Sequence, residues 1–157
     1  MKKTFNGPSI RRQVMGYRSD VAYTIRFKTE EDYRLFVLEA KANSETAGCF
    51  PPNDGSLFEE CECNDQKFRI DFRAESVKWY DTSPDVAMHE KLIDQAQEWI
   101  DDDTHMEIKD GGSGHDAYRL GYVFVRIGED EDDIERKEGG NNAYDWLYVE
   151  RKISTDW

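Results

Sequence analysis

The sequence predicts an α+β fold, and three of its features support this prediction. Several short stretches rich in Val, Ile, Tyr and Phe alternate apolar with polar residues, which is the pattern of a half-buried strand. Two other stretches repeat apolar residues at intervals of three and four, as an amphipathic helix does. Eight tyrosines, eight phenylalanines and four tryptophans supply enough apolar area for the core of one domain within 157 residues.

The first strand and the first helix are expected at residues 21–28 and 30–42. The apolar face of the strand consists of Val21, Tyr23, Ile25 and Phe27. Thr29 is a suitable N-cap for the helix, and the acids that follow it favour a helix N-terminus. The apolar residues of the helix fall at positions i, i+3, i+4 and i+7, and they are Tyr33, Phe36, Val37 and Ala40.

A hairpin is expected next, with strands at residues 57–63 and 67–74 around Asn64-Asp65. Its second strand has the clearest alternation in the chain, with charged residues on one face. The opposite, apolar face consists of Phe68, Ile70, Phe72 and Ala74. This pattern predicts a sheet with one buried face and one face in contact with solvent.

A second helix is expected at residues 84–101, because Ser83 and Pro84 are typical of an N-cap and a first helical position. Its apolar stripe consists of His89, Leu92, Ile93, Ala96, Trp99 and Ile100. Three aspartates close the helix, although carboxylates at a helix C-terminus oppose its dipole. Folding alone does not explain these acids.

Three further strands are expected at residues 105–109, 117–127 and 143–153. A glycine loop at 110–114 precedes the last two, and an acidic connection at 128–142 joins them. Both faces of this last pair are apolar, so either helices cover both faces or one aromatic face binds a partner. The aromatic residues concerned are Tyr144, Trp146 and Tyr148.

The first six elements follow the order of a split βαβ unit, so the expected architecture is a ferredoxin-like sandwich, βαββαβ. The C-terminal strand pair is expected to extend or cap this sandwich. Residues 1–19 have no periodicity and are expected to form a basic N-terminal arm. Residues 20–157 are expected to form a single acidic α+β domain.

Charge is divided unevenly along the chain, whose formal net charge is -13. Residues 1–29 hold seven basic residues and one acid, whereas residues 30–157 hold 14 basic residues and 33 acids. A body this acidic repels phosphate and anionic lipid and attracts basic surfaces, so direct nucleic-acid binding is not expected. No apolar run is long enough to span a membrane. Three cysteines and the absence of a secretory signal favour a cytoplasmic location.

Motifs for metals and cofactors are weak, and neither is expected. Cys49, Cys61 and Cys63 do not have the paired spacing of a zinc site. The glycine loop is an alternative site, because its backbone amides can converge on an anion beside a titratable histidine. The residues of this alternative are Gly112, Ser113, Gly114, His115 and Asp116. It predicts a small-ligand-binding protein or a small enzyme.

The charge favours a protein that acts by binding and not by catalysis. We expect an acidic interaction or inhibitor protein whose partner is basic, in particular a nucleic-acid-binding protein; homo-oligomer formation stays open. In charge and size the chain resembles the nucleic-acid mimics that phages and other mobile elements use against host nucleases. This resemblance implies competition with nucleic acid. The expected partner-binding residues are Asp101, Asp102, Asp103, Glu129, Asp130, Glu131, Asp132, Asp133, Tyr144 and Trp146.

Overall fold

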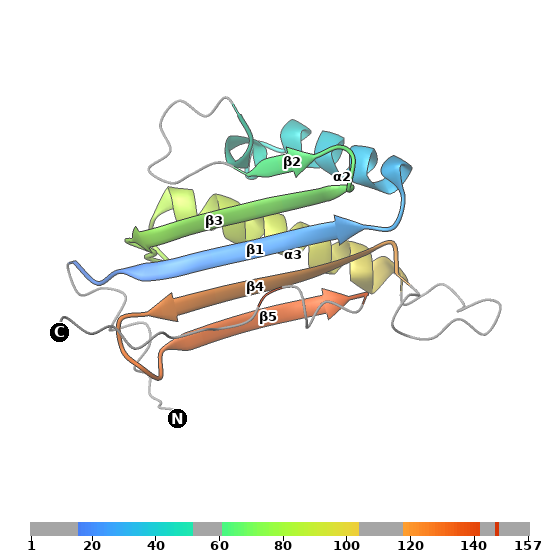
Figure 1. Ribbon diagram of the computed structural model, residues 1–157. Helices are drawn as coiled ribbons and strands as arrows, with labels where there is room; N and C mark the ends of the chain where they lie inside the picture. The colour runs from blue at the N-terminus through green and yellow to red at the C-terminus, as the bar shows by residue number, and fades with distance from the viewer. Residues whose placement is uncertain (1–15, 52–60, 104–117, 142–146, 148–157) are drawn as a thin grey trace.

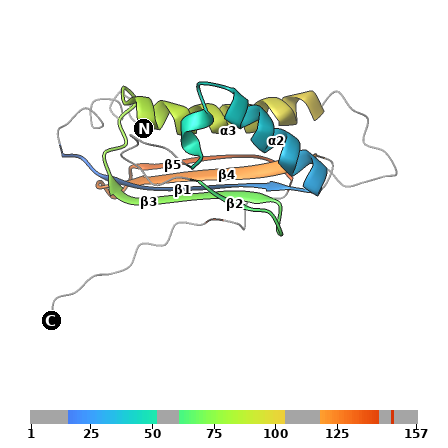
Figure 2. The ribbon, with the colours of Figure 1, turned by 90° about the horizontal axis from the view of Figure 1, so that it is seen from above.

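The computed structural model describes residues 16–51, 61–103, 118–141 and Leu147. These residues form a five-stranded antiparallel sheet with two α-helices on one face (Figures 1 and 2), which confirms the predicted α+β class. The strand order is β2-β3-β1-β4-β5. In chain order the elements are β1 (Ser19–Phe27), α2 (Glu30–Ala42), the 3-10 turn η1 (Ala47–Cys49), β2 (Glu62–Asn64), β3 (Arg69–Val77), α3 (Pro84–Asp103), β4 (Leu120–Gly128) and β5 (Ile134–Gly140).

Strand β1 and helix α2 form where the sequence predicts them. The alternating apolar residues of β1 are buried on the face that the helices cover. Thr29 caps α2, because its side chain accepts a hydrogen bond from the Asp32 backbone N–H at 3.2 Å. Tyr33, Phe36 and Ala40 are the buried residues of α2. A satisfied N-cap contributes about 1 kcal/mol, so the packing of this apolar face accounts for most of the helix stability.

The hairpin and the second helix are also present. Strand β2 spans three residues, and β3 buries Ile70, Phe72 and Ala74 while Arg73 is exposed. Most of the predicted strand at 57–63 lies outside the described residues. Helix α3 continues two residues beyond the predicted end, so all three terminal aspartates belong to its last turn.

The neighbours of β4 differ from the prediction. Within the described residues, β4 pairs with β1 along one edge and with β5 along the other. β5 lies inside the stretch that was predicted to be an acidic connection, and that prediction is wrong for Ile134–Gly140. The segments 105–109 and 143–153, except Leu147, lie outside the described residues. Among the described strands, β5 is the one that extends the sheet beyond β4.

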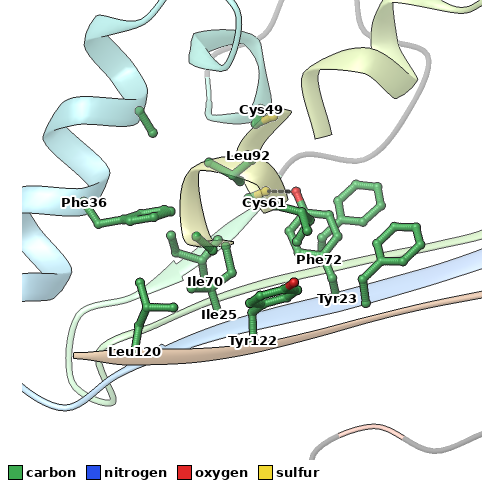
Figure 3. Close-up of a cluster of buried hydrophobic side chains, with 14 of the residues drawn as sticks. Tyr23, Ile25, Phe36, Cys49, Cys61, Ile70, Phe72, Leu92, Leu120 and Tyr122 are labelled. Carbon is green, nitrogen blue, oxygen red and sulfur yellow. Dashed lines mark hydrogen bonds between the residues drawn. The ribbon is translucent and has the colours of Figure 1, made fainter. Parts of the chain in front are cut away.

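The main core lies between the sheet and the helices, and much of it is aromatic (Figure 3). The Tyr23 ring stacks on the Phe72 ring with their centroids 5.0 Å apart. The Phe36 ring packs edge-on against the Trp99 ring at 5.3 Å, which joins α2 to α3. Each buried ring contributes about 1.5–3 kcal/mol through the area removed from water.

The face of β4 away from the helices is also apolar. Val123 and Val125 are buried there, and Leu147 packs against them. On the helix side, Tyr122 and Phe124 are buried in the main core. Both faces of β4 are therefore covered, so of the two interpretations that the sequence left open, the described part of this strand favours burial over an exposed aromatic surface.

Candidate functional site

The solvent-facing side of α3 carries a row of carboxylates. The helix contains seven acids and a single lysine, a formal charge of -6. Its other side buries Val86, Leu92, Ala96 and neighbouring residues against the sheet. Four of the acids are exposed, and they recur at intervals of three and four, so they share one face. We call this set the acidic stripe, and it consists of Asp94, Glu98, Asp101 and Asp102.

The lysine of α3 forms an ion pair with an acid outside this stripe. Lys91 Nζ lies 3.9 Å from a carboxylate oxygen of Glu45, which belongs to the segment after α2. This ion pair is exposed, so its own contribution to stability is small. Its effect is to place the positive charge of α3 beside another acid, away from Asp101 and Asp102 near the helix C-terminus.

The negative potential of the stripe extends into the protein. Burial, followed by the charges of Asp94, Asp101 and Glu138, raises the pKa of Tyr122 above its usual value. The Tyr122 hydroxyl donates a hydrogen bond to Gln97 Oε1 at 2.7 Å, and Gln97 Nε2 donates one to Asp101 at 3.0 Å. This chain of hydrogen bonds links Asp101 of the stripe to the core.

A second group of acids forms the turn between β4 and β5. The turn is closed by the Gly128 N–H, which donates to the Asp133 carbonyl at 2.8 Å. Asp130, Glu131 and Asp132 are exposed, but Asp133 is only 6% exposed and bonds to Arg126. Asp133 was predicted to bind a partner, but its charge is buried in this ion pair and is not offered at the surface.

Two residues just before β1, Tyr17 and Arg18, form hydrogen bonds with this turn. The Tyr17 hydroxyl donates to Asp133 Oδ2 at 2.5 Å and accepts a hydrogen bond from the Asp130 N–H at 3.3 Å. The Arg18 N–H donates to Glu129 Oε2 at 2.5 Å. Burial and the hydrogen bond to Asp133 raise the pKa of Tyr17. Tyr17 and Arg18, just before β1, are thus hydrogen-bonded to the acidic turn.

The structure does not bring the two groups of acids together. Ile100, in the last turns of α3, lies beside Gly139 and Gly140 at the end of β5. The acidic turn lies at the opposite end of β4 and β5 (Figure 1). Nine residues of strand separate the two ends by about 27 Å. A partner that binds the acidic stripe therefore contacts a surface different from the turn.

Several predicted site residues lie outside the described residues. They are Tyr144, Trp146, and the glycine loop with Gly112, Ser113, Gly114, His115 and Asp116. Asp103 is the last residue of α3. Sequence reasoning missed Asp94 and Glu98, although their spacing on the polar side of a predicted helix was the available signal.

Within the described residues, no three or more His, Cys, Asp or Glu side chains are arranged to hold a metal ion. The helices described here are too short or too polar to cross a membrane. No family model, curated protein or solved structure matches the chain. Its function has to be inferred from its own residues.

Proposed function

We propose that the chain is an acidic interaction protein that binds a basic surface of another protein through the acidic stripe of α3. One observation carries the proposal: four exposed carboxylates lie on one face of a helix whose opposite face is anchored in the core. Two of them stand where the helix dipole disfavours acids, so their placement opposes helix stability. A binding role accounts for acids at a place where the helix dipole does not favour them.

The spacing of the stripe supports a nucleic-acid-binding partner. Residues 94–102 of a helix span about 12 Å, and the successive steps between the four carboxylates are about 6, 4.5 and 1.5 Å along the axis, a mean of about 4 Å. One strand of duplex DNA carries a charge about every 3.4 Å. A groove that accepts a row of phosphates can therefore accept this row of carboxylates, and the chain would act as a nucleic-acid mimic and inhibitor.

The proposal has an electrostatic signature. Exposed charge pairs contribute about 0.2–1 kcal/mol each, so affinity depends on several pairs acting together. Such pairs increase the association rate and weaken as salt shortens the screening length. Binding should therefore fall in steps as acids are neutralised, and it should fall strongly with salt.

We also propose that the first four strands and the two helices form a split βαβ sandwich of the ferredoxin-like type, to which β5 adds an edge. Two features support this proposal. In each of the units β1-α2-β2 and β3-α3-β4, a helix connects two strands that are not neighbours in the sheet. One strand of the other unit lies between them. β3 lies between β1 and β2, and β1 lies between β3 and β4.

The test compares two variants of equal net charge. The stripe variant carries Asp94→Asn, Glu98→Gln, Asp101→Asn and Asp102→Asn. The control variant carries four Glu→Gln substitutions at exposed acids elsewhere, at positions 31, 62, 75 and 131. Each is immobilised and exposed to a lysate of the source organism at about 0.15 M salt, then washed at about 0.5 M, a range over which screening strengthens.

We expect the natural chain and the control to retain a nucleic-acid-binding protein at low salt and to release it at high salt or on addition of duplex DNA. The stripe variant should retain much less. Equal retention by the stripe variant and the control would refute the role of α3. A retained protein that resists both salt and duplex would refute the mimicry.

A further inference from the structure

Two cysteines from separate segments lie side by side in the core. Cys49 ends η1, and Cys61 immediately precedes β2. The Cys61 N–H donates a hydrogen bond to the Cys49 carbonyl at 2.9 Å, and the two residues are 2% and 0% exposed. A backbone hydrogen bond keeps the two main chains adjacent; in an antiparallel ladder, residues that exchange such bonds have Cα atoms about 5.5 Å apart. Disulfides join Cα atoms about 4.4–6.8 Å apart, so this adjacency is compatible with a bridge.

The Cys61 thiol contacts the Cys49 thiol and a buried tyrosine. The Cys61 Sγ lies 3.0 Å from the Tyr23 hydroxyl (Figure 3), and the Tyr23 oxygen is 2.6 Å from His89 Nδ1. A hydrogen bond with the Cys49 thiol, together with burial, raises the pKa of Cys61 well above its usual value. Both cysteines are free thiols in this state.

We propose that Cys49 and Cys61 form a modification site, a dithiol that a disulfide oxidant such as oxidised glutathione converts into an intrachain disulfide. The two S–H bonds break and one S–S bond forms. The two electrons released reduce the disulfide of the oxidant to two thiols, which take up the two protons. This proposal is independent of the proposed binding function.

Access to the buried pair comes through local opening. β2 has three residues and is an edge strand among the described strands, where it pairs with β3. A short edge strand separates from its sheet at a lower free-energy cost than global unfolding. Opening here exposes Cys61 while the remaining strands stay paired, and the high pKa of Cys61 makes the reaction slow.

The bridge would join two elements on different layers of the fold. η1 packs against α3, whereas β2 belongs to the sheet. A covalent link between them restricts the unfolded chain more than the folded one. The oxidised protein should therefore unfold at a higher denaturant concentration than the reduced protein, and a thiol reductant should abolish the difference.

The experiment treats the folded, reduced full chain with a series of oxidised and reduced glutathione mixtures at neutral pH. Thiols that remain are alkylated after denaturation, counted by mass spectrometry and located by peptide mapping. We expect the count to fall from three to one, with Cys63 as the alkylated residue and Cys49 linked to Cys61. A Cys63→Ser variant should form the same bridge.

Two results would overturn the proposal. One is a bridge that uses Cys63, within the chain or between two chains. The other is retention of all three thiols in mixtures that oxidise the urea-unfolded chain. A Cys61→Ala variant should form no intrachain bridge; should it fail to fold, the peptide map of the natural chain decides the question.

Discussion

Arg126 and Asp133 form a buried, bidentate ion pair across the turn between β4 and β5. Their side chains are 1% and 6% exposed, and the Nη2–Oδ1 and Nη1–Oδ2 distances are 2.6 and 3.2 Å. Arg126 also donates to Ser19 Oγ and to Glu135. Burial lowers the pKa of Arg126, but the hydrogen bonds and charges of Asp133 and Glu135 outweigh it, so this pKa is raised. The pair fixes the turn to β1 and β4.

Removing the carboxylate of this pair should destabilise the protein strongly. An Asp133→Ala variant leaves the Arg126 charge buried with Glu135 as its remaining acidic partner, so we expect a loss of about 3 kcal/mol in the free energy of unfolding. Urea unfolding measures this loss. The matched control is Glu131→Ala in the same turn, where an exposed side chain should change stability by less than about 0.5 kcal/mol. Equal losses in the two variants would contradict a structural role for the pair.

A side chain at position 128 should destabilise the protein, because it would disturb the ion pair between Arg126 and Asp133. A Cβ atom at this position would overlap the Asp133 carboxylate and the Tyr17 hydroxyl. We expect Gly128→Ala to cost about 1–3 kcal/mol, because Asp133 has to move away from Arg126. Its effect should not add to that of Asp133→Ala in a double-mutant cycle, since both substitutions break one contact. Additive losses would show that Gly128 acts through some other contact.

Much of the helical structure follows from local patterns. α2 has an N-cap, acids in its first turn and an apolar stripe, all within one short segment. The buried alternation of β1 and β3 is equally local. These signals need no knowledge of the partner strand, so the sequence alone is enough to predict them.

The features that could not be predicted from the sequence depend on contacts between separate segments of the chain. β5 reads IERKEGG, which has one apolar residue and no alternation, and its residues are exposed or half-buried. It is a strand because β4 supplies an edge, and exposed charges are typical of such edge strands. The burial of Asp133 depends on Arg126 seven residues away, and the contact between Cys49 and Cys61 depends on packing between separate segments.

Tyrosine ionisation should limit stability at high pH. Burial raises the pKa values of Tyr17, Tyr23, Tyr33 and Tyr122 above the usual value of 10.0, assisted by bonds such as that from Tyr33 to Asp65. Above pH 10 the unfolded chain therefore binds fewer protons than the folded chain, and stability falls as pH rises. Below pH 10 these groups are protonated in both states, so their contribution stays constant.

Absorbance at the tyrosinate band measures this effect during an alkaline titration. We expect these four tyrosines to ionise only as the chain unfolds, together with the loss of the circular dichroism signal. A Tyr33→Phe variant removes one of these groups and should make the fall in stability above pH 10 less steep. Ionisation of all eight tyrosines near pH 10 in a chain that stays folded would contradict the prediction.

The acids at the end of α3 should lower the stability of the protein while they strengthen its binding to a basic partner, and both effects can be measured. Asp101 and Asp102 lie in the last turn, where the partial negative charge of the helix repels them. Their replacement by asparagine should raise the free energy of unfolding by about 0.3–1 kcal/mol for each charge removed. Glu31 is the control, because it lies in the first turn of α2, where the dipole favours an acid. Glu31→Gln should therefore lower stability by a similar amount.

If the acidic stripe binds a basic partner, the Asp101→Asn, Asp102→Asn variant should be more stable and bind less, whereas Glu31→Gln should be less stable and bind as before. A variant at Asp101 and Asp102 that loses stability would show that these acids serve the fold, and the argument for a binding role would fail.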